Sequence, residues 1–260
     1  MKIPRDFSDL LTPRGRRVLD GRDREWVSAL AVPGATFIAS TALIDRSKAA
    51  ALRDELERAL LQHLVPLEAP IPFETISELQ ENYRELLPKT VRVRTAMLER
   101  RRAKSSQVAE AMGLTALLQS ESFGEFAAAV SGRRLRRRWG TQVLCYGPGD
   151  YAGPHHDHHP EDDEAREGYT DVHLSLSTPA VAQQLLVYAR EGHFSGLTSV
   201  NTVGGVTAYR LPFWHYTTPL VARRGKEAAA RRWVLLGTFI DASPGARRGA
   251  AVDPPALRLR

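Results

Sequence analysis

The chain has 260 residues, of which 43% are apolar and 25% are charged, a composition typical of a globular protein with a substantial core. No stretch approaches the ~20 apolar residues that a membrane-spanning helix needs, and the first residues lack the apolar segment of a secretory signal. The single cysteine, Cys145, excludes a disulfide within the chain, and we expect a cytoplasmic protein.

The net charge of +6 raises the question of a nucleic-acid partner. Basic side chains concentrate in an arginine-rich run from Arg133 to Arg138 and in a shorter basic run at 100–104. Proteins that bind single strands combine such charges with stacking aromatic side chains, and only Trp139 adjoins the longer run. We therefore expect a solvated surface there, no nucleic-acid partner and a small-molecule substrate.

The N-terminal half is expected to be mostly helical. Residues 1–34 form an arm on the surface, and 35–132 brace the rest of the molecule. Asp45 should cap the first helix, while Ser122 and Glu125 should form a capping box for the last one, which stops at Gly132. The pattern predicts strands at 35–38 and 91–95, helices at 45–64, 76–87, 104–119 and 122–131, and a proline-rich linker at 66–72.

After residue 132 the pattern changes to short β-type runs separated by turns. The predicted strands are 141–146, 172–177, 185–188, 206–211, 216–221 and 233–240. Many short strands with glycine and proline turns favour a sandwich or jelly roll. No sharp change of composition divides the chain, so we predict one domain over 1–260. Its β core is 133–241, and its tail at 242–260 is expected to be mobile.

A cluster of histidines follows a glycine- and proline-rich turn in this region. In an extended segment His155 and Asp157 point to the same side, so they can share one metal ion. They would supply two of the three ligands of the facial triad of two histidines and one carboxylate that holds non-haem Fe(II). The best candidate for the third ligand is His215, 58 residues after Asp157 (215 − 157). The alternatives are His173 or His193 as third ligand, and pairings through His156, His158 or His159.

Residues 146–157, His215 and the segment 232–240 together resemble the signature of the Fe(II)/2-oxoglutarate-dependent oxygenases, closest to the prolyl-hydroxylase-like branch. The family pattern is a tyrosine-containing strand and turn, H-x-D, a distal histidine and a basic residue that opens the last core strand. The resemblance covers roughly residues 139–241. It implies a mainly β, cupin-like double-stranded β-helix braced by N-terminal helices, with iron held by His155, Asp157 and His215.

The resemblance also implies a site for 2-oxoglutarate, whose distal carboxylate needs a buried cation. Arginine suits a carboxylate because its planar fork donates two parallel hydrogen bonds and stays charged when desolvated. Arg231 and Arg232 are adjacent, so only one can point inward from a strand, and both faces of that strand are apolar. The family register favours Arg232, and it also suggests that Tyr146 hydrogen-bonds the cosubstrate.

The activity implied is that of a dioxygenase that uses Fe(II), 2-oxoglutarate and O₂ and releases succinate and CO₂. Hydroxylation of an unactivated C–H bond in an amino acid or natural-product intermediate is the expected reaction, with desaturation and cyclisation as alternatives. A rival hypothesis is an arginine-rich module that binds nucleic acid or protein on the same fold, with a non-catalytic metal site. A further alternative is a peptide or protein hydroxylase.

Overall fold

The computed structural model describes residues 3–69, 90–156, 169–190, 192–211 and 213–242, so the helix predicted at 76–87, Asp157 and most of the predicted tail lie outside it. The helices are α1 (Pro13–Leu19), α2 (Arg46–Ala59), α4 (Lys104–Met112), α5 (Leu114–Leu118) and α6 (Glu121–Ser131), with short 3₁₀ turns η1 (Phe7–Leu10), η2 (Ala29–Ala31), η3 (Leu61–His63) and η5 (Glu227–Ala229). None of the described helices is long and apolar enough to cross a membrane.

The strands dominate the C-terminal half, as the sequence predicts. They are β1 (Phe37–Ser40), β2 (Val65–Ala69), β3 (Val91–Met97), β4 (Leu135–Tyr146), β5 (Tyr151–His155), β6 (Tyr169–Ser177), β7 (Val181–Gln183), β8 (Leu185–Arg190), β9 (His193–Ser199), β10 (Val203–Arg210), β11 (His215–Thr217), β12 (Val221–Ala222) and β13 (Arg232–Asp241).

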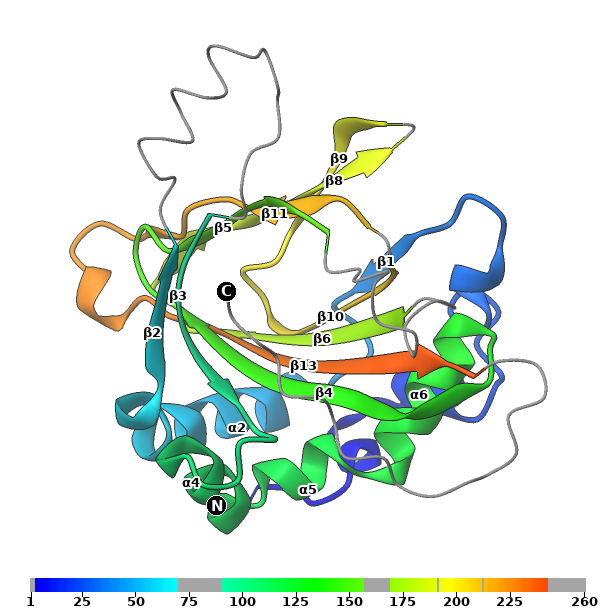
Figure 1. The fold of residues 1–260 in the computed structure, drawn as a ribbon, viewed down its shortest axis with the longest axis horizontal. Helices are drawn as coiled ribbons and strands as arrows, with labels where there is room; N and C mark the ends of the chain where they lie inside the picture. Colours follow the sequence, from blue (N-terminus) through cyan, green and yellow to red (C-terminus); the bar gives the residue numbers. More distant parts are fainter. Residues whose placement is uncertain (1–2, 70–89, 157–168, 191, 212, 243–260) are drawn as a thin grey trace.

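Eleven of these strands pair into one antiparallel sheet that curls into a barrel. Their order is β1-β10-β6-β13-β4-β3-β5-β11-β8-β9, with β2 added to β3. Strands β10, β6, β13 and β4 form one wall, β5, β11 and β8 lie opposite, and β3 links the two walls at one side (Figure 1). Strands β7 and β12 form a small separate pair. The predicted fold class, mainly β with a jelly-roll type of core, is confirmed.

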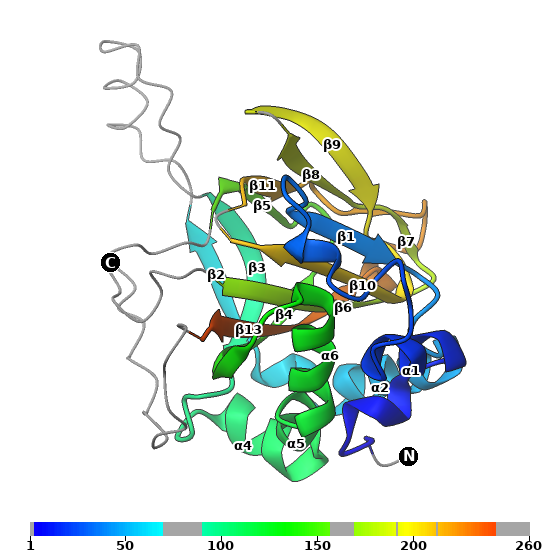
Figure 2. The same cartoon turned by 90° about the vertical axis from the view of Figure 1, so that its right-hand side faces the viewer.

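The helices cover the outer side of the β4–β13–β6 wall (Figure 2). Every second side chain of β13 points toward them, and Trp233, Leu235 and Phe239 belong to one buried apolar cluster with Phe123 and Phe126 of α6. The Phe123 and Phe239 rings meet edge to face with centroids 5.4 Å apart. This packing leaves the other face of β13 to line the barrel interior.

Helix α2 begins where the sequence predicts. The Asp45 side chain accepts hydrogen bonds from the backbone N–H groups of Ser47 and Lys48, which confirms it as the N-cap. The helix ends at Ala59 instead of continuing to residue 64, because η3 and then β2 follow it. Strand β2 overlaps the predicted linker and contains Pro66, which is tolerated because β2 pairs only with β3 and is an edge strand.

Three predictions for the N-terminal half are wrong in detail. The proposed capping box fails because α6 starts at Glu121, so Ser122 lies inside the helix, where its hydroxyl donates to Asp6. The helix predicted at 104–119 is broken at Gly113, whose φ of 89° is left-handed. The N-terminal arm is not confined to the surface, since Phe7, Leu10, Val18 and Trp26 are fully buried. They belong to the same buried apolar cluster between the helices and the sheet as Trp233 and Phe123, which we call the helix-side cluster.

The contact between α6 and β13 gives a stability prediction. A Cβ atom at Gly237 would lie 2.6 Å from Cε1 of Phe123, whereas one at Gly140 on β4 meets no described atom within 4 Å. We expect Gly237→Ala to lower the free energy of unfolding by about 1–3 kcal/mol through overpacking. Gly140→Ala should leave it within about 0.5 kcal/mol. Denaturant titration of both variants checks this, and equal effects would show that Phe123 does not restrict β13.

Candidate functional site

His155 and His215 lie side by side on the barrel wall opposite the helices. His155 ends β5 and His215 begins β11, and the two are direct partners in the antiparallel register. Their ring centroids are 4.3 Å apart, and the residues are 8% and 4% exposed. The pairing of β5 with β11 thus brings together two histidines that are 60 residues apart in the chain (215 − 155).

Each of the two rings is oriented by its own backbone. Nδ1 of His155 bonds the carbonyl oxygen of Gly153 at 2.6 Å, and Nδ1 of His215 bonds that of Phe213 at 2.8 Å. Because a carbonyl oxygen can only accept, Nδ1 must carry the hydrogen in both rings. The neutral rings therefore present Nε2 as the basic nitrogen. Histidines that bind metals characteristically donate their other N–H to a carbonyl or carboxylate in this way.

The third expected ligand, Asp157, lies outside the described residues, as do His158 and His159. Within the described parts of the chain, no group of three histidine, cysteine, aspartate or glutamate side chains is arranged to hold a metal ion. The assignment of His155, Asp157 and His215 as iron ligands therefore stays a prediction.

The competing histidines have other surroundings. Nε2 of His173 shares a hydrogen bond of 2.9 Å with the hydroxyl of Tyr209. His193 is exposed on the β8–β9 hairpin. His156 packs edge-on against the ring of Trp214, with centroids 4.6 Å apart.

Arg232 opens β13 and points into the barrel. It is 4% exposed and lies opposite Tyr146 in the register with β4. Its Nε and Nη2 donate to Oγ of Ser175 at 3.3 and 3.1 Å, and its Nη1 donates to Oε1 of Gln184 at 3.2 Å. The guanidinium carbon lies 5.3 Å from the centre of the Tyr146 ring.

Among the residues that the structure describes, no carboxylate compensates the charge of Arg232. It forms no ion pair with any carboxylate that the structure describes, and its hydrogen-bond acceptors there are neutral. Burial removes the guanidinium from water and lowers its pKa to about 10. A buried cation held only by neutral groups favours the binding of an anion.

The neighbouring Arg231 points to the other side of the strand. It is only part-buried, its Nη1 donates to the backbone oxygen of Ala228 at 2.9 Å, and the same atom lies 3.7 Å from Oε2 of Glu57. The sequence pattern did not decide which of the two arginines faces inward; in the structure it is Arg232.

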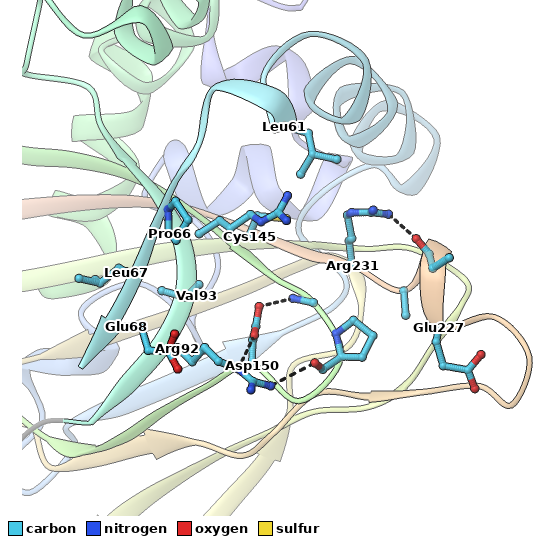
Figure 3. A pocket seen from close by; sticks show the side chains of 15 residues that line it. Leu61, Pro66, Leu67, Glu68, Arg92, Val93, Cys145, Asp150, Glu227 and Arg231 are labelled. Carbon is cyan, nitrogen blue, oxygen red and sulfur yellow. Dashed lines mark hydrogen bonds and ion pairs between the residues drawn. The ribbon is translucent and has the colours of Figure 1, made fainter. Parts of the chain in front are cut away.

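Arg231 also lines a cavity of about 400 Å³ outside the barrel, between the paired strands β2 and β3 on one side and η5 on the other (Figure 3). The cavity contains an ion pair of 2.9 Å between Nε of Arg92 and Oδ1 of Asp150, and no histidine is among its lining residues. Cys145 borders it, but burial raises the pKa of that thiol, so it is not a reactive nucleophile at neutral pH. The cavity is therefore separate from the histidine pair.

Ser175 and Gln184, which hold Arg232, were not predicted as site residues. Gln184 is completely buried, and its amide nitrogen donates to the backbone oxygens of Thr218 at 3.0 Å and Asp150 at 3.3 Å. These bonds direct the amide oxygen toward Arg232. A lone glutamine between two strands carries no motif, so only the folded chain identifies it.

Comparisons of the sequence with protein-family models and with curated proteins find no match. Solved structures do match. SnoN, described as a non-heme alpha ketoglutarate dependent epimerase from nogalamycin biosynthesis, has a TM-score of 0.53 and 13% identity over 92% of each chain. SnoK, a non-heme alpha ketoglutarate dependent carbocyclase from the same biosynthesis, has a TM-score of 0.51 and 12% identity over 86% of each chain.

Two further structures are similar. SnoN in complex with Fe3+, alpha ketoglutarate and nogalamycin RO has a TM-score of 0.52, 13% identity and 92% coverage of each chain. A prolyl-4-hydroxylase from Pseudomonas putida has a TM-score of 0.49 and 16% identity over 88% of this chain and 99% of its own. The resemblance named from the sequence is thus confirmed at the level of the fold, by SnoN and SnoK: this chain has the fold of alpha ketoglutarate dependent, non-heme enzymes.

Proposed function

We propose that the protein is an Fe(II)- and 2-oxoglutarate-dependent dioxygenase that oxidises a small molecule inside the barrel. The observation that carries the proposal is Arg232, a buried cation without a described carboxylate partner. It lies in the same barrel as the paired rings of His155 and His215. An anionic cosubstrate and a metal ion would satisfy these two features together.

The residues fit these two groups chemically. Nε2 of His155 and Nε2 of His215 would bind the iron together with Asp157, as Fe(II) accepts imidazole and carboxylate ligands. Arg232 would bind the distal carboxylate of 2-oxoglutarate through its fork, with Ser175 and Gln184 holding that fork in place. When bound, iron and 2-oxoglutarate would supply the oxidising chemistry, which consumes O₂ and releases succinate and CO₂.

The chain's own part is positioning and exclusion of water. Tyr146 packs on the guanidinium of Arg232 and shields one side of it. Phe213 lies against His215, with ring centroids 5.3 Å apart, and Tyr209 lies 5.1 Å away on the same measure. These aromatic rings fix His215 and make the surroundings of the reacting groups apolar, which strengthens the electrostatic interactions inside the barrel.

Within this chemistry we propose hydroxylation of an amino acid or natural-product intermediate in the cytoplasm. The names of SnoN and SnoK record an epimerase and a carbocyclase, so the fold also serves other outcomes. Because substrate placement decides between such outcomes, hydroxylation is the part of the proposal that product analysis must test.

The rival function as a nucleic-acid module has weaker support. Nη1 of Arg133 lies 2.9 Å from Oδ2 of Asp241, and Nη2 of Arg210 lies 3.6 Å from the same oxygen. Arg133, which belongs to the basic run, therefore forms an ion pair within the molecule. This pair joins the segment before β4 to the end of β13.

The ligand assignment predicts the behaviour of four variants. His155→Ala, Asp157→Ala and His215→Ala should each abolish Fe(II)-dependent succinate formation. They should also weaken metal binding, measured by equilibrium dialysis, by more than the roughly 10–100-fold that loss of an outer hydrogen-bond partner costs. His193→Ala is the matched control, because His193 is exposed and lies on the edge strand β9, two strands from β11, and it should retain both properties. Full activity in His215→Ala would show that another residue is the distal ligand.

The cosubstrate assignment predicts a contrast between adjacent arginines. Arg232→Leu should raise the KM for 2-oxoglutarate roughly 30-fold to several thousandfold, because truncating one side of a buried charge pair costs about 2–5 kcal/mol. Arg231→Leu, on the outer side of the same strand, should change it far less. Steady-state kinetics of 2-oxoglutarate turnover without a primary substrate measures both, and the reverse order would transfer the role to Arg231.

The charge assignment predicts that no oligonucleotide, single- or double-stranded, binds more tightly than about 10⁻⁴ to 10⁻⁶ M at physiological salt. Replacing Arg136, Arg137 and Arg138 by glutamine should leave 2-oxoglutarate turnover nearly unchanged. Fluorescence titrations at several salt concentrations test this. Sub-micromolar binding that weakens steeply with salt and disappears in the triple variant would favour the rival function.

A further inference from the structure

Strand β6 carries a row of polar side chains on its inner face. Val172, Leu174 and Leu176 point outward into the helix-side cluster. The alternate residues therefore face the barrel interior, among them Ser175, which binds Arg232, then His173 and Asp171. The proposed function uses Ser175 and leaves His173 and Asp171 without a role.

Asp171 is a buried carboxylate without a hydrogen-bond partner among the residues that the structure describes. The residue is 2% exposed, and its Oδ1 accepts no hydrogen bond from any group that the structure describes. Its Oδ2 lies 3.8 Å from Nε2 of His173, which is too long for a hydrogen bond. Carboxylates removed from water are normally paired with a cation or several donors. The Asp171 carboxylate can therefore still accept a hydrogen-bond donor or a cation from a bound molecule.

His173 does not supply the missing hydrogen bond to Asp171, because its Nε2 bonds another group. Its Nε2, the atom nearest to Asp171, shares the 2.9 Å hydrogen bond with the Tyr209 hydroxyl. Tyr209 also lies directly opposite Asp171 in the register of β10 with β6. The Tyr209 ring is in turn 5.1 Å from the ring of His215, centroid to centroid. Asp171 thus faces the same space as the candidate metal ligands, one side chain removed from them.

The space around Asp171 is aromatic. A buried cluster at this end of the barrel consists of Tyr169, Tyr188, Tyr209, Leu211, Phe213 and Ile240. A carboxylate among aromatic rings is a good site for an ammonium group, which gains an ion pair with the carboxylate and attraction to the ring faces. A neutral hydroxyl group would gain only a hydrogen bond.

Arg232 is too distant to neutralise Asp171. Ser175, the partner of Arg232, is four residues along β6 from Asp171 (175 − 171), which corresponds to roughly 13 Å at about 3.3 Å per residue. The interior therefore holds a cationic end for the cosubstrate and an anionic end for a different group.

We propose that Asp171, with His173 and Tyr209 beside it, binds a protonated amine of the primary substrate, so that the substrate class is small amines. This inference rests on the proposed function for the identity of the barrel as an active site. The amine site itself requires neither iron nor turnover, so the two proposals can fail separately.

The test compares a cationic and a neutral probe of the same shape. Benzylamine and benzyl alcohol are titrated at pH 7 into the full-length, iron-free protein with saturating 2-oxoglutarate, and binding is followed by ligand-observed NMR. We expect benzylamine to bind wild type at least about tenfold more tightly than benzyl alcohol, and this preference to disappear in Asp171→Asn. Glu227→Gln, which removes one exposed carboxylate outside the barrel, should keep it.

The thermal stability of Asp171→Asn gives an independent readout. Because Oδ1 of Asp171 accepts no hydrogen bond from the described residues and Nε2 of His173 is 3.8 Å from its Oδ2, replacement by asparagine should leave the melting temperature unchanged or higher. A variant that melts much earlier or fails to fold would show that the fold itself needs the carboxylate, and would overturn the proposal. Equal binding of the two probes to wild type, or a preference that persists in Asp171→Asn, would also overturn it. If the amine preference is intact but 2-oxoglutarate turnover is absent, only the proposal of an oxygenase is refuted.

Discussion

The burial of the Arg232 guanidinium is the constraint on which the site depends. Removing an ion from water costs roughly several kcal/mol, and Ser175 and Gln184 offset only part of this cost because they are neutral. The chain holds the cation in place through the fixed amide of Gln184 and through its position at the start of a central strand. A cation stabilised in this incomplete way is preorganised for an anion, since the protein does not have to rearrange when the anion arrives.

The stability that allows such an interior comes from the other side of the same strands. On β13 the outward residues Trp233, Leu235 and Phe239 pack in the helix-side cluster, while Arg232 faces inward on a strand that is three places from the edge strand β1. On β6 Val172, Leu174 and Leu176 face the helices, while Asp171, His173 and Ser175 face inward. Because the helices bury the outward faces, the hydrophobic stabilisation of the wall does not depend on the interior, which can therefore carry charged and hydrogen-bonding groups.

The strand pattern and the order of the motifs could be predicted from the sequence, because alternation and glycine or proline turns are local properties. Strand β5 was not predicted, since Gly153 and Pro154 disfavour strands, although it is β5 that places His155 opposite His215. The choice between Arg231 and Arg232 could not be made from periodicity, because both faces of β13 are apolar in sequence. Only the pairing of strands and helices distinguishes them.

The remaining site residues show a more general limit of sequence analysis. Ser175, Gln184 and Asp171 belong to no motif, and each would pass as an ordinary polar residue of a strand or turn. The capping box failed for a related reason, because the Ser122 hydroxyl bonds Asp6, which is 116 residues away in the chain. In both cases the partner comes from a distant segment, and a local pattern contains no information about it.

The two charged ends of the interior also depend on the rigidity of the sheet. Arg232 and Asp171 carry opposite charges on neighbouring strands and face the same space, so in a flexible chain they would attract and neutralise each other. The register prevents this, because Arg232 lies opposite Ser177 and Asp171 lies opposite Thr238, six residues further along β13. At about 3.3 Å per residue this separation is roughly 20 Å, beyond the reach of either side chain. A continuous antiparallel ladder thus keeps the two side chains apart, and an anion at Arg232 and a cation at Asp171 would occupy separate places in the barrel interior.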